Sequence, residues 1–470
     1  MIPIPFCGPA YKNDSLSISA QTCKNLYPEL NGKNSKVVTA LKPTPGSKWW
    51  VKLQGNGPVR KIRTTSNNRF FGVCGYTLSE VSAAGVTTVR GTITTPAGRV
   101  DMSDNGLQLI VVDAEAGKGW IFTFADNSFA EITSSGYPGG SHVSFINQRF
   151  LVNKPDTQQF YWSDLADGLT WDGSFASAEG SPDWVNSMIA FRGEEWVFGN
   201  QSYEVFDNVG TGFSVIDGTH NDVGCAAVNS IAKSDNNVFW LGGDDNGQGR
   251  VMTNEGYGAR SISDLAIEQT IQRYSTISDA IGYCYQQLGH EFYVLGFPTA
   301  KATWVYDLST NLWHERDYID SNGYKTMHRG ATQDVFNGKV YIGDWLNGNI
   351  YELDPDYPTD NGEKIHRERA CPHIWNNMDR AFYGSFQLDI EVGVGLTGEG
   401  QDSNPMVMLD TSDDGGKTFG NERWMPAGKI GEYTKRLIWN RMGSSRDRIF
   451  RIKMTDPVKW VVLGAYVDLK

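Results

Sequence analysis

The chain has 470 residues, of which 52 are glycine and 12% are aromatic, and acidic residues outnumber basic ones by 54 to 42. The resulting net charge of −12 argues against a protein that grips a DNA duplex through a broad basic face, because such binding depends on neutralising phosphates. The length predicts two or three domains, and the glycine and aromatic content favours an all-β fold.

The first 58 residues are punctuated by prolines and show little periodicity, which predicts an extended N-terminal arm followed by the first strands. The apolar residues in the run Leu26–Leu30 anchor this arm. Met1–Pro5 lacks the basic and apolar regions of a secretory leader, and no apolar run approaches the ~20 residues of a membrane helix. The six cysteines are scattered without a CxxC pair, so we expect reduced thiols.

Residues 59–375 contain a series of hairpin signals, in which two β-rich runs flank a turn of Gly, Asn or Asp. Examples are 106–112 with 119–124, 195–199 with 203–206, and 339–343 with 350–353. The units recur near the ~40–50-residue period of propeller repeats, which predicts an irregular β-propeller of about six or seven blades. A large multi-sheet sandwich is the alternative.

Two further elements complete the predicted architecture. The segment 261–276 predicts one inserted helix, capped by Ser263 or Asp264, with Leu265, Ile267, Ile271 and Tyr274 on its inner face. From residue 376 to 470, short strands such as the alternating run Ser385–Val392 predict a separate C-terminal β-sandwich-like domain.

The clearest local motif is Ser412–Phe419, which fits the Asp-box pattern S-x-D-x-G-x-T-aromatic. In this reading Asp414 binds backbone amides of its own turn, starting from Ser412, while Gly416 permits a positive φ and Phe419 anchors the hairpin. The motif predicts a structural turn and no catalytic role.

Enzymatic and metal-binding motifs are weak. A glycosidase needs two carboxylates across a cleft, and the candidates are numerous and nonspecific: Glu194, Glu195, Asp207, Asp307, Glu315 and Asp344. Cys371, His373 and His366 match no zinc spacing, the acidic segments 242–247 and 354–362 match no calcium loop, and 116–119 lacks the full phosphate-loop pattern. We therefore expect no catalytic residue, metal or cofactor.

Two basic clusters remain. The run Arg60–Arg63 alternates, so its charges are expected on one strand face. A second cluster near the C-terminus is represented by Arg436, Arg441, Arg448 and Arg451, interleaved with Trp439 and Phe450. This cluster could face phosphates or another subunit, and the acidic total favours a solvated or subunit-facing surface.

Several segments, in order along nearly the whole chain, resemble the packaged-DNA stabilisation proteins of short-tailed bacteriophages. They are Lys24–Glu29, Pro43–Gly46, Ile262–Tyr274, Gly289–Tyr293, Trp313–Glu315 and Arg436–Gly443. The resemblance implies a non-catalytic tail accessory factor, also called a nozzle or tail hub protein. It implies a hexameric ring below the portal and adaptor that retains the DNA and then forms the conduit for its ejection.

The same resemblance implies the partners and the location. The expected partners are other copies of this chain, the head-to-tail adaptor, a tail needle or tailspike or fibre proteins, and double-stranded DNA in transient passage. The expected location is the virion tail, after synthesis in the host bacterial cytoplasm. Two alternatives stay open at this point: a glycan-binding or glycan-hydrolysing propeller used for receptor attachment, and a generic intracellular scaffold.

Overall fold

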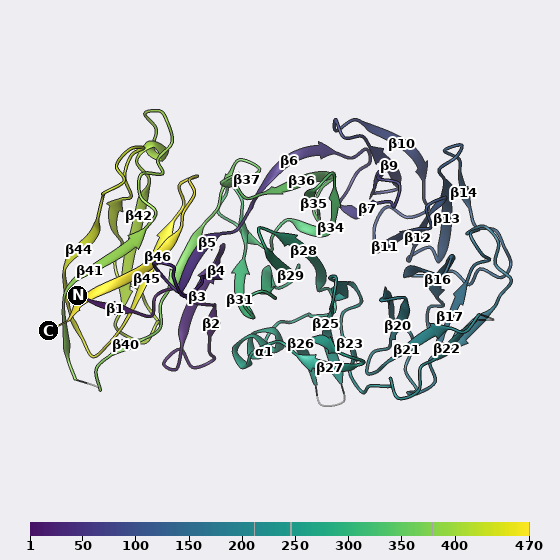
Figure 1. Ribbon diagram of the computed structural model, residues 1–470, viewed down its shortest axis with the longest axis horizontal. Coiled ribbons are helices and arrows are strands. Elements are labelled where there is room, and N and C mark those ends of the chain that lie inside the picture. Colours follow the sequence, from purple (N-terminus) through teal and green to yellow (C-terminus); the bar gives the residue numbers. More distant parts are fainter. Residues whose placement is uncertain (211, 245–246, 378, 470) are drawn as a thin grey trace.

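The computed structural model describes residues 1–210, 212–244, 247–377 and 379–469. A ring of β-sheets occupies one end of the molecule and a β-sandwich the other, and the N- and C-termini lie together at the sandwich end (Figure 1). The prediction of an all-β propeller with a C-terminal sandwich is confirmed.

Blades 1 to 4 each contain four consecutive antiparallel strands. Blade 1 consists of β7 (Val59–Thr64), β8 (Phe70–Cys74), β9 (Thr77–Val81) and β10 (Thr87–Thr92). Blade 2 consists of β11 (Val100–Asp104), β12 (Gln108–Asp113), β13 (Lys118–Thr123) and β14 (Phe129–Glu131). Blade 3 consists of β15 (Val143–Ile146), β16 (Arg149–Asn153), β17 (Gln159–Trp162) and β18 (Phe175–Ser177). Blade 4 consists of β19 (Ser187–Phe191), β20 (Glu194–Phe198), β21 (Tyr203–Asn208) and β22 (Phe213–Val215).

Three further blades complete the ring. Blade 5 has a broken inner strand, formed by β23 (Gly224–Cys225), the 3₁₀ turn η1 (Val228–Ser230) and β24 (Ala232–Lys233), followed by β25 (Val238–Asp244), β26 (Gly247–Glu255) and β27 (Gly258–Ser261). Blade 6 consists of β28 (Ile281–Gln287), β29 (His290–Phe297), β30 (Ala302–Asp307) and β31 (Leu312–Arg316). Blade 7 consists of β34 (Gly330–Phe336), β35 (Lys339–Asp344), β36 (Asn349–Asp354) and, from the N-terminal region, β6 (Gly46–Lys52).

The outer strand of blade 7 closes the ring. β6 precedes blade 1 in the chain but pairs antiparallel with β36, in the register Leu353↔Ser47 and Ile350↔Val51. On the inner side, the backbone N–H of Thr64 in blade 1 donates to Asp334 of blade 7 at 2.9 Å. The ring is therefore closed by contacts between its first and last segments at both its inner and outer edges.

Apolar side chains fill the spaces between neighbouring blades. In β12, Leu109 and Val111 pack against blade 1, while Ile110 and Val112 pack against blade 3. Successive side chains of a strand point to opposite faces of the sheet, so a strand buried on both faces needs an uninterrupted apolar run. This explains why the run 109–112 is continuously hydrophobic in the sequence.

The sandwich consists of two sheets that face each other. One contains β44 (Leu437–Ser445), β41 (Ala381–Ile390), β46 (Val462–Leu469), β5 (Thr39–Pro43) and β4 (Leu26–Leu30), with β1 (Ile2–Ile4) on β46. The other contains β43 (Arg423–Pro426), β42 (Met406–Ser412), β45 (Asp447–Met454), β39 (Arg367–Ala370) and β3 (Ala20–Lys24), with β2 (Tyr11–Lys12) on β3 and β40 (Ile374–Trp375) on β45. Phe386 and Phe450 stack between the sheets at 4.7 Å.

The two domains share a sheet and a core. β3 pairs antiparallel with β39 of the sandwich and parallel with β31 of blade 6, where Lys24 lies opposite Glu315. One continuous apolar cluster contains Leu295 of blade 6 together with Phe450 of the sandwich. A hinge between the domains would have to break both, so propeller and sandwich form one mechanical unit.

The N-terminal arm, residues 1–58, is extended but bound along its length, because β1 to β5 join the sandwich and β6 joins blade 7. The boundary expected between 375 and 376 moves to an earlier position, since β39 (Arg367–Ala370) already pairs with β45. Local sequence could not reveal the pairing of β39 with β45, because these strands lie about 80 residues apart. It could not reveal the pairing of β1 with β46 either, because these strands lie at opposite ends of the chain.

The predicted helix is present as α1 (Leu265–Gln272), inside the expected range 261–276. Asp264 caps it by accepting a hydrogen bond from the N–H of Ile267. Leu265 was expected on the inner face but is exposed, and Ala266 is buried in its place beside Ile267 and Ile271.

The remaining short elements are β32 (Tyr318–Ile319), β33 (Lys325–Thr326), β37 (Thr359–Asp360), β38 (Glu363–Lys364) and η2 (Gln401–Ser403). Within the described part of the chain, no helix has the length and hydrophobicity needed to cross a membrane.

Candidate functional site

The basic run Arg60–Arg63 joins blades 1 and 2. The side chain of Arg60 is 1% exposed and lies 3.1 Å from Asp113. Lys61 lies 2.8 Å from Asp101, and Arg63 lies 3.2 Å from Asp104. All three cations turn to the same side, as expected, but each meets an aspartate of blade 2. The basic run therefore links blades 1 and 2 through ion pairs.

A second polar group crosses the propeller axis. Arg99, just before blade 2, donates to the carbonyl of Val228 in blade 5 at 2.9 Å. Asp101 accepts from the N–H of Val143 in blade 3, and the His142 ring hydrogen-bonds Ser187 of blade 4 at 2.9 Å. Blades 2 and 5 are not neighbours, so the Arg99 contact spans the centre of the ring. These side chains therefore fill the centre of the propeller at the position of Arg99.

Burial determines the charge states in this group. It lowers the pKa of His142 well below its ordinary value, so the ring is neutral, and it lowers the pKa of Arg99 to about 10. Burial alone would raise the pKa of Asp101, but Lys61 and Arg99 outweigh it and hold that pKa below the ordinary range. The group thus contains an ion pair between Lys61 and Asp101 and the neutral imidazole of His142.

Glu195 lies in β20 of blade 4, near this polar group. Among the described residues, no cation lies within salt-bridge distance of its carboxylate. One carboxyl oxygen accepts a hydrogen bond from Ser144 at 2.6 Å, while the other is buried without a hydrogen-bond partner. Burial raises the pKa of Glu195 to about 8. The carboxyl is therefore mostly protonated at neutral pH.

The Asp-box segment forms a compact turn between β42 and β43. Asp414 accepts hydrogen bonds from the backbone N–H groups of Lys417 and Thr418 at 3.0 Å and from the hydroxyl of Ser412 at 2.7 Å. Gly416 has φ +88°, a conformation that glycine adopts without strain. The half-buried ring of Phe419 packs near Ala20 and Ile449. Hydrogen bonds from the Thr418 hydroxyl and amide hold the pKa of Asp414 below its ordinary range.

The C-terminal basic cluster is divided by the structure. Arg448 is buried and forms a two-point ion pair with Asp413 at 2.6 Å, and Arg451 pairs with Asp410 at 2.6 Å and covers the Phe419 ring. Arg436 and Arg441 are exposed. The four arginines therefore do not form one continuous exposed cluster, because Arg448 and Arg451 pair with aspartates in and just after β42.

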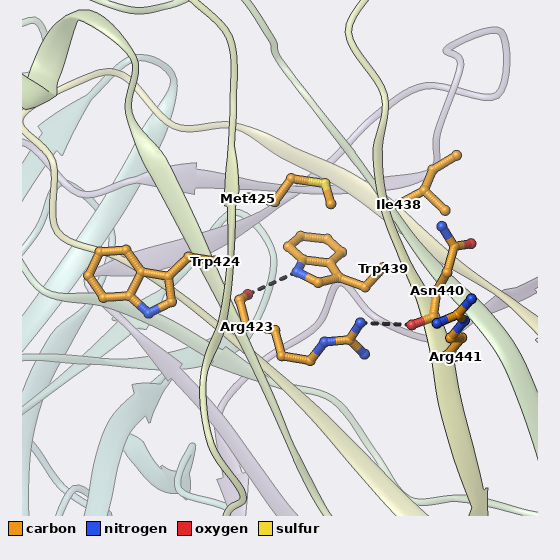
Figure 2. Close-up of a pocket in the computed structure, with 7 residues that line it drawn as sticks. All are labelled: Arg423, Trp424, Met425, Ile438, Trp439, Asn440 and Arg441. Carbon is orange, nitrogen blue, oxygen red and sulfur yellow. Dashed lines mark hydrogen bonds between the residues drawn. The ribbon is translucent and has the colours of Figure 1, made fainter.

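Aromatic and basic residues line an open groove where the edges of the two sandwich sheets meet (Figure 2). It has a volume of about 620 Å³ and lies between β43 and β44. Arg423 donates to the carbonyl of Asn440 at 2.7 Å, and the indole N–H of Trp439 donates to the carbonyl of Arg423 at 2.9 Å. These bonds bridge the two edge strands, while Trp424 is left 53% exposed.

A deeper cleft of about 640 Å³ lies between the propeller and the sandwich. Its walls come from β2 and the following loop, from α1, and from blade 6 with the β32–β33 hairpin. The lining contains two acidic residues, Asp14 and Glu315, and six basic ones: Lys12, Lys24, Arg273, Lys301, Arg316 and Lys325. Trp304 lies in its wall and donates its indole N–H to the Tyr274 hydroxyl at 3.1 Å. Sequence reasoning missed this interdomain cleft, because its walls come from segments about 300 residues apart.

The carboxylates considered for glycoside hydrolysis are dispersed over blades 4, 6 and 7. Among the partners that hold them are Tyr257 for Glu194, Ser144 for Glu195, His290 for Asp307, Lys24 for Glu315 and Arg329 for Asp344, whereas Asp207 is exposed at the end of β21. These contacts give the five partnered carboxylates structural roles in turns and between strands.

The residues considered for metal binding also lie apart. Cys371 is buried and His366 is exposed, while His373 hydrogen-bonds Asp447 at 2.7 Å and the carbonyl of Leu16. All six cysteines are free thiols. Over the described residues, no three His, Cys, Asp or Glu side chains are grouped so that they could hold a metal ion.

Together, these features describe a closed β-propeller, with seven blades over the described residues, that is built as one body with a β-sandwich. Family comparison agrees with that division. Residues 2–357 match the model described as "Bacteriophage P22 Gp10, beta-propeller", and residues 366–470 match "Bacteriophage P22 Gp10, beta-sandwich". The chain belongs to this family of bacteriophage structural proteins, which stabilise packaged DNA in short-tailed phages.

Other comparisons are distant. A search of curated proteins finds no match. Among solved structures, the extracellular domain of the putative hybrid two component system BT4673 from B. thetaiotaomicron aligns at 9% identity with a TM-score of 0.46 and covers 66% of this chain. This chain spans 40% of that protein's length. A catalytically inactive virginiamycin B lyase from Staphylococcus aureus aligns at 12% identity with a TM-score of 0.44, covering 70% of this chain and 98% of that one.

Proposed function

We propose that this protein is a ring-forming subunit of a phage tail, placed below the portal and adaptor, which retains packaged DNA and forms part of the conduit for its ejection. In this role the adaptor is its upper partner, and a needle, tailspike or fibre protein attaches further down. It would be made in the host cytoplasm, act in the virion tail and perform no catalysis. The match of the whole chain to the P22 Gp10 family carries this proposal.

The construction of the molecule suits a conduit under load. Blade 6 continues through β3 into the sandwich, and β6 closes the ring from the N-terminal side. Internal DNA pressure would act on such a subunit as on one rigid body, because β3 is hydrogen-bonded to both domains. Both ends of the chain are also held in the sandwich, where β1 pairs with β46.

The packed centre of the propeller bears on where the DNA would pass. The Arg99–Val228 contact crosses the ring between blades 2 and 5, and the adjacent Asp101 and His142 are bonded to blades 3 and 4. A duplex could not pass here without breaking these bonds. In our proposal the DNA channel is therefore formed between several copies, and an acidic wall would repel the duplex so that it can slide.

The test is assembly on the phage's own portal–adaptor complex, imaged by electron microscopy. We expect a ring of six copies that extends the channel, and no ring on a portal that lacks the adaptor. DNA-filled heads with the ring should also retain DNA that is lost, and becomes accessible to nuclease, without it. A protein that stays monomeric in the presence of the complex and leaves DNA retention unchanged would overturn the proposal.

A further inference from the structure

The negative charge of the chain is concentrated in one sector of the propeller. Residues 155–232, most of which form blades 3 and 4, contain twelve acidic residues and a single basic one, Arg192. This sector therefore carries a formal net charge of −11 out of the −12 of the whole chain. The rest of the protein is close to neutral.

Part of this charge gathers on two neighbouring loops, 178–186 and 216–223, and at the adjacent, largely buried Glu204 of β21. We call this the acidic patch and define it by Glu179, Asp183, Glu204, Asp217 and Asp222. His220 of the second loop lies 3.4 Å from the Ser181 hydroxyl of the first loop, 3.7 Å from Glu204 and 3.2 Å from Asp222. Among the described residues, no lysine or arginine lies within salt-bridge distance of these five carboxylates.

The acidic patch also has an apolar component. Trp184, in the first loop, is 55% exposed, and Val215 at the end of β22 is exposed as well. An exposed tryptophan within a charged surface is typical of protein–protein contacts. A surface that only faced solvent would not need it.

The interdomain cleft has the opposite character. Of its eight charged lining residues six are basic, and those without a close ionic partner in the described part of the chain include Lys12 and Lys301, both exposed. Its apolar lining includes Leu16 and Trp304. The cleft elements β2 and α1 lie towards the sandwich, whereas the strands of blades 3 and 4 lie at the far end of the propeller (Figure 1).

We propose that the acidic patch of one copy docks in the interdomain cleft of the next copy. This inference rests on the proposed ring and identifies its subunit contact. The two surfaces differ and lie on separate parts of the chain, which is the arrangement that head-to-tail contacts require. Trp184 brings an apolar side chain to a cleft wall that contains Trp304 and Leu16, and the carboxylates meet the lysines around it.

DNA is a poorer occupant of the same cleft. Asp14 lies 3.8 Å from Arg273, and Glu315 lies 3.5 Å from Lys24, so two of the cations already have carboxylates that would repel phosphates. The volume of about 640 Å³ has room for a few protruding side chains but not for a duplex. An acidic protein loop needs only a few of the cations and can fill the space around Trp304.

The test is charge reversal followed by rescue. We expect Lys12→Glu with Lys301→Glu to weaken ring assembly about tenfold or more, and Glu179→Lys with Asp217→Lys to do the same. A variant carrying all four changes should regain assembly, because every contact in its ring would again join opposite charges. Matched controls, Lys52→Glu with Lys417→Glu and Glu115→Lys with Glu255→Lys, reverse exposed charges elsewhere and should assemble like the wild type.

A zero-length lysine–carboxylate cross-linker applied to the wild-type ring gives an independent readout. We expect links from Lys12 or Lys301 to Glu179 or Asp217 that join isotopically labelled to unlabelled copies. If the wild type forms rings but neither reversal affects them, the inference is overturned and the proposed function stands. If the wild type forms no ring at all, the proposed function itself fails.

Two further outcomes would also overturn the inference. Lys12→Glu with Lys301→Glu could leave the ring intact but reduce a salt-dependent affinity for duplex DNA, which would assign the cleft to phosphates. Alternatively, both reversals could abolish assembly with no rescue in the fourfold variant, while the cleft variant alone loses adaptor binding. The cleft would then belong to the adaptor.

Discussion

Two ways of satisfying a buried arginine occur in this protein, one at Arg60 and Arg329 of the propeller and the other at Arg369 of the sandwich. In the propeller, Arg60 pairs with Asp113 at 3.1 Å and Arg329 with Asp344 at 2.7 Å, so each cation meets a carboxylate of the same or the next blade. In the sandwich, Arg369 is fully buried without such a carboxylate among the described residues. It donates instead to the carbonyls of Phe6, Pro9 and Thr22 and to the side chain of Gln21.

The difference shows how each domain is completed. A blade is built from consecutive hairpins, so its charged partners come from nearby sequence. Arg369 has no such partner among the described residues and uses the backbone of the N-terminal arm, which has to lie beside β39 before this charge is satisfied. The arm is thus a structural part of the sandwich.

The largest effect is expected from Arg369→Met. The change leaves four buried or partly buried acceptors without their donor and loosens the arm, so we expect a loss of about 4 kcal/mol in the free energy of unfolding. Urea denaturation measures it, and limited proteolysis should cut within residues 1–24. Arg436→Met, which removes an exposed side chain from the same domain, should change stability by less than about 0.5 kcal/mol. Equal effects of the two changes would contradict the comparison.

In the propeller, Arg60→Met should cost about 3 kcal/mol, because Asp113 stays buried without its cation. Adding Asp113→Asn removes the stranded charge, and we expect it to recover about 1–2 kcal/mol of the loss. A double-mutant cycle by denaturation measures this coupling. Strictly additive costs would show that the ion pair is not what joins blades 1 and 2.

A smaller, pH-dependent effect is expected from Glu195→Gln. The folded-state pKa of Glu195 is raised to about 8, so the folded protein binds a proton that the unfolded chain releases as pH rises through its ordinary, lower pKa. This residue therefore lowers wild-type stability progressively from about pH 5 to pH 8. The variant should lack this loss and be about 2 kcal/mol more stable at about pH 8, with little difference at about pH 4. Parallel stability curves for the two proteins would contradict the assignment.

The smallest effect on global stability is expected from Asp414→Ala in the sandwich turn. The amides of Lys417 and Thr418 lose their acceptor, so hydrogen exchange at these positions should become roughly tenfold faster. Lys417→Ala keeps the acceptor and should leave the exchange of Thr418 unchanged. Unaltered exchange in the Asp414 variant would mean that the turn is held by other contacts.

The sequence predicted what depends on local pattern. The alternation and apolar runs of single hairpins predicted the all-β class, the propeller and the sandwich, and Asp264 with the following apolar residues predicted α1. What remained hidden depends on distant pairing: β6 closing blade 7, the arm within the sandwich, and the cleft between Lys12 and Lys301. Arg448 and Arg451 looked like a basic surface because the sequence does not reveal that Asp413 and Asp410 face them.

The most direct test of the central claim is a cryo-electron microscopy map of the tail in a DNA-filled particle. We predict copies of this chain in a ring below the adaptor, with DNA density on the axis between the copies and none through the centre of any single propeller. DNA running through the middle of a propeller, or a tail that contains no ring of this chain, would contradict the account.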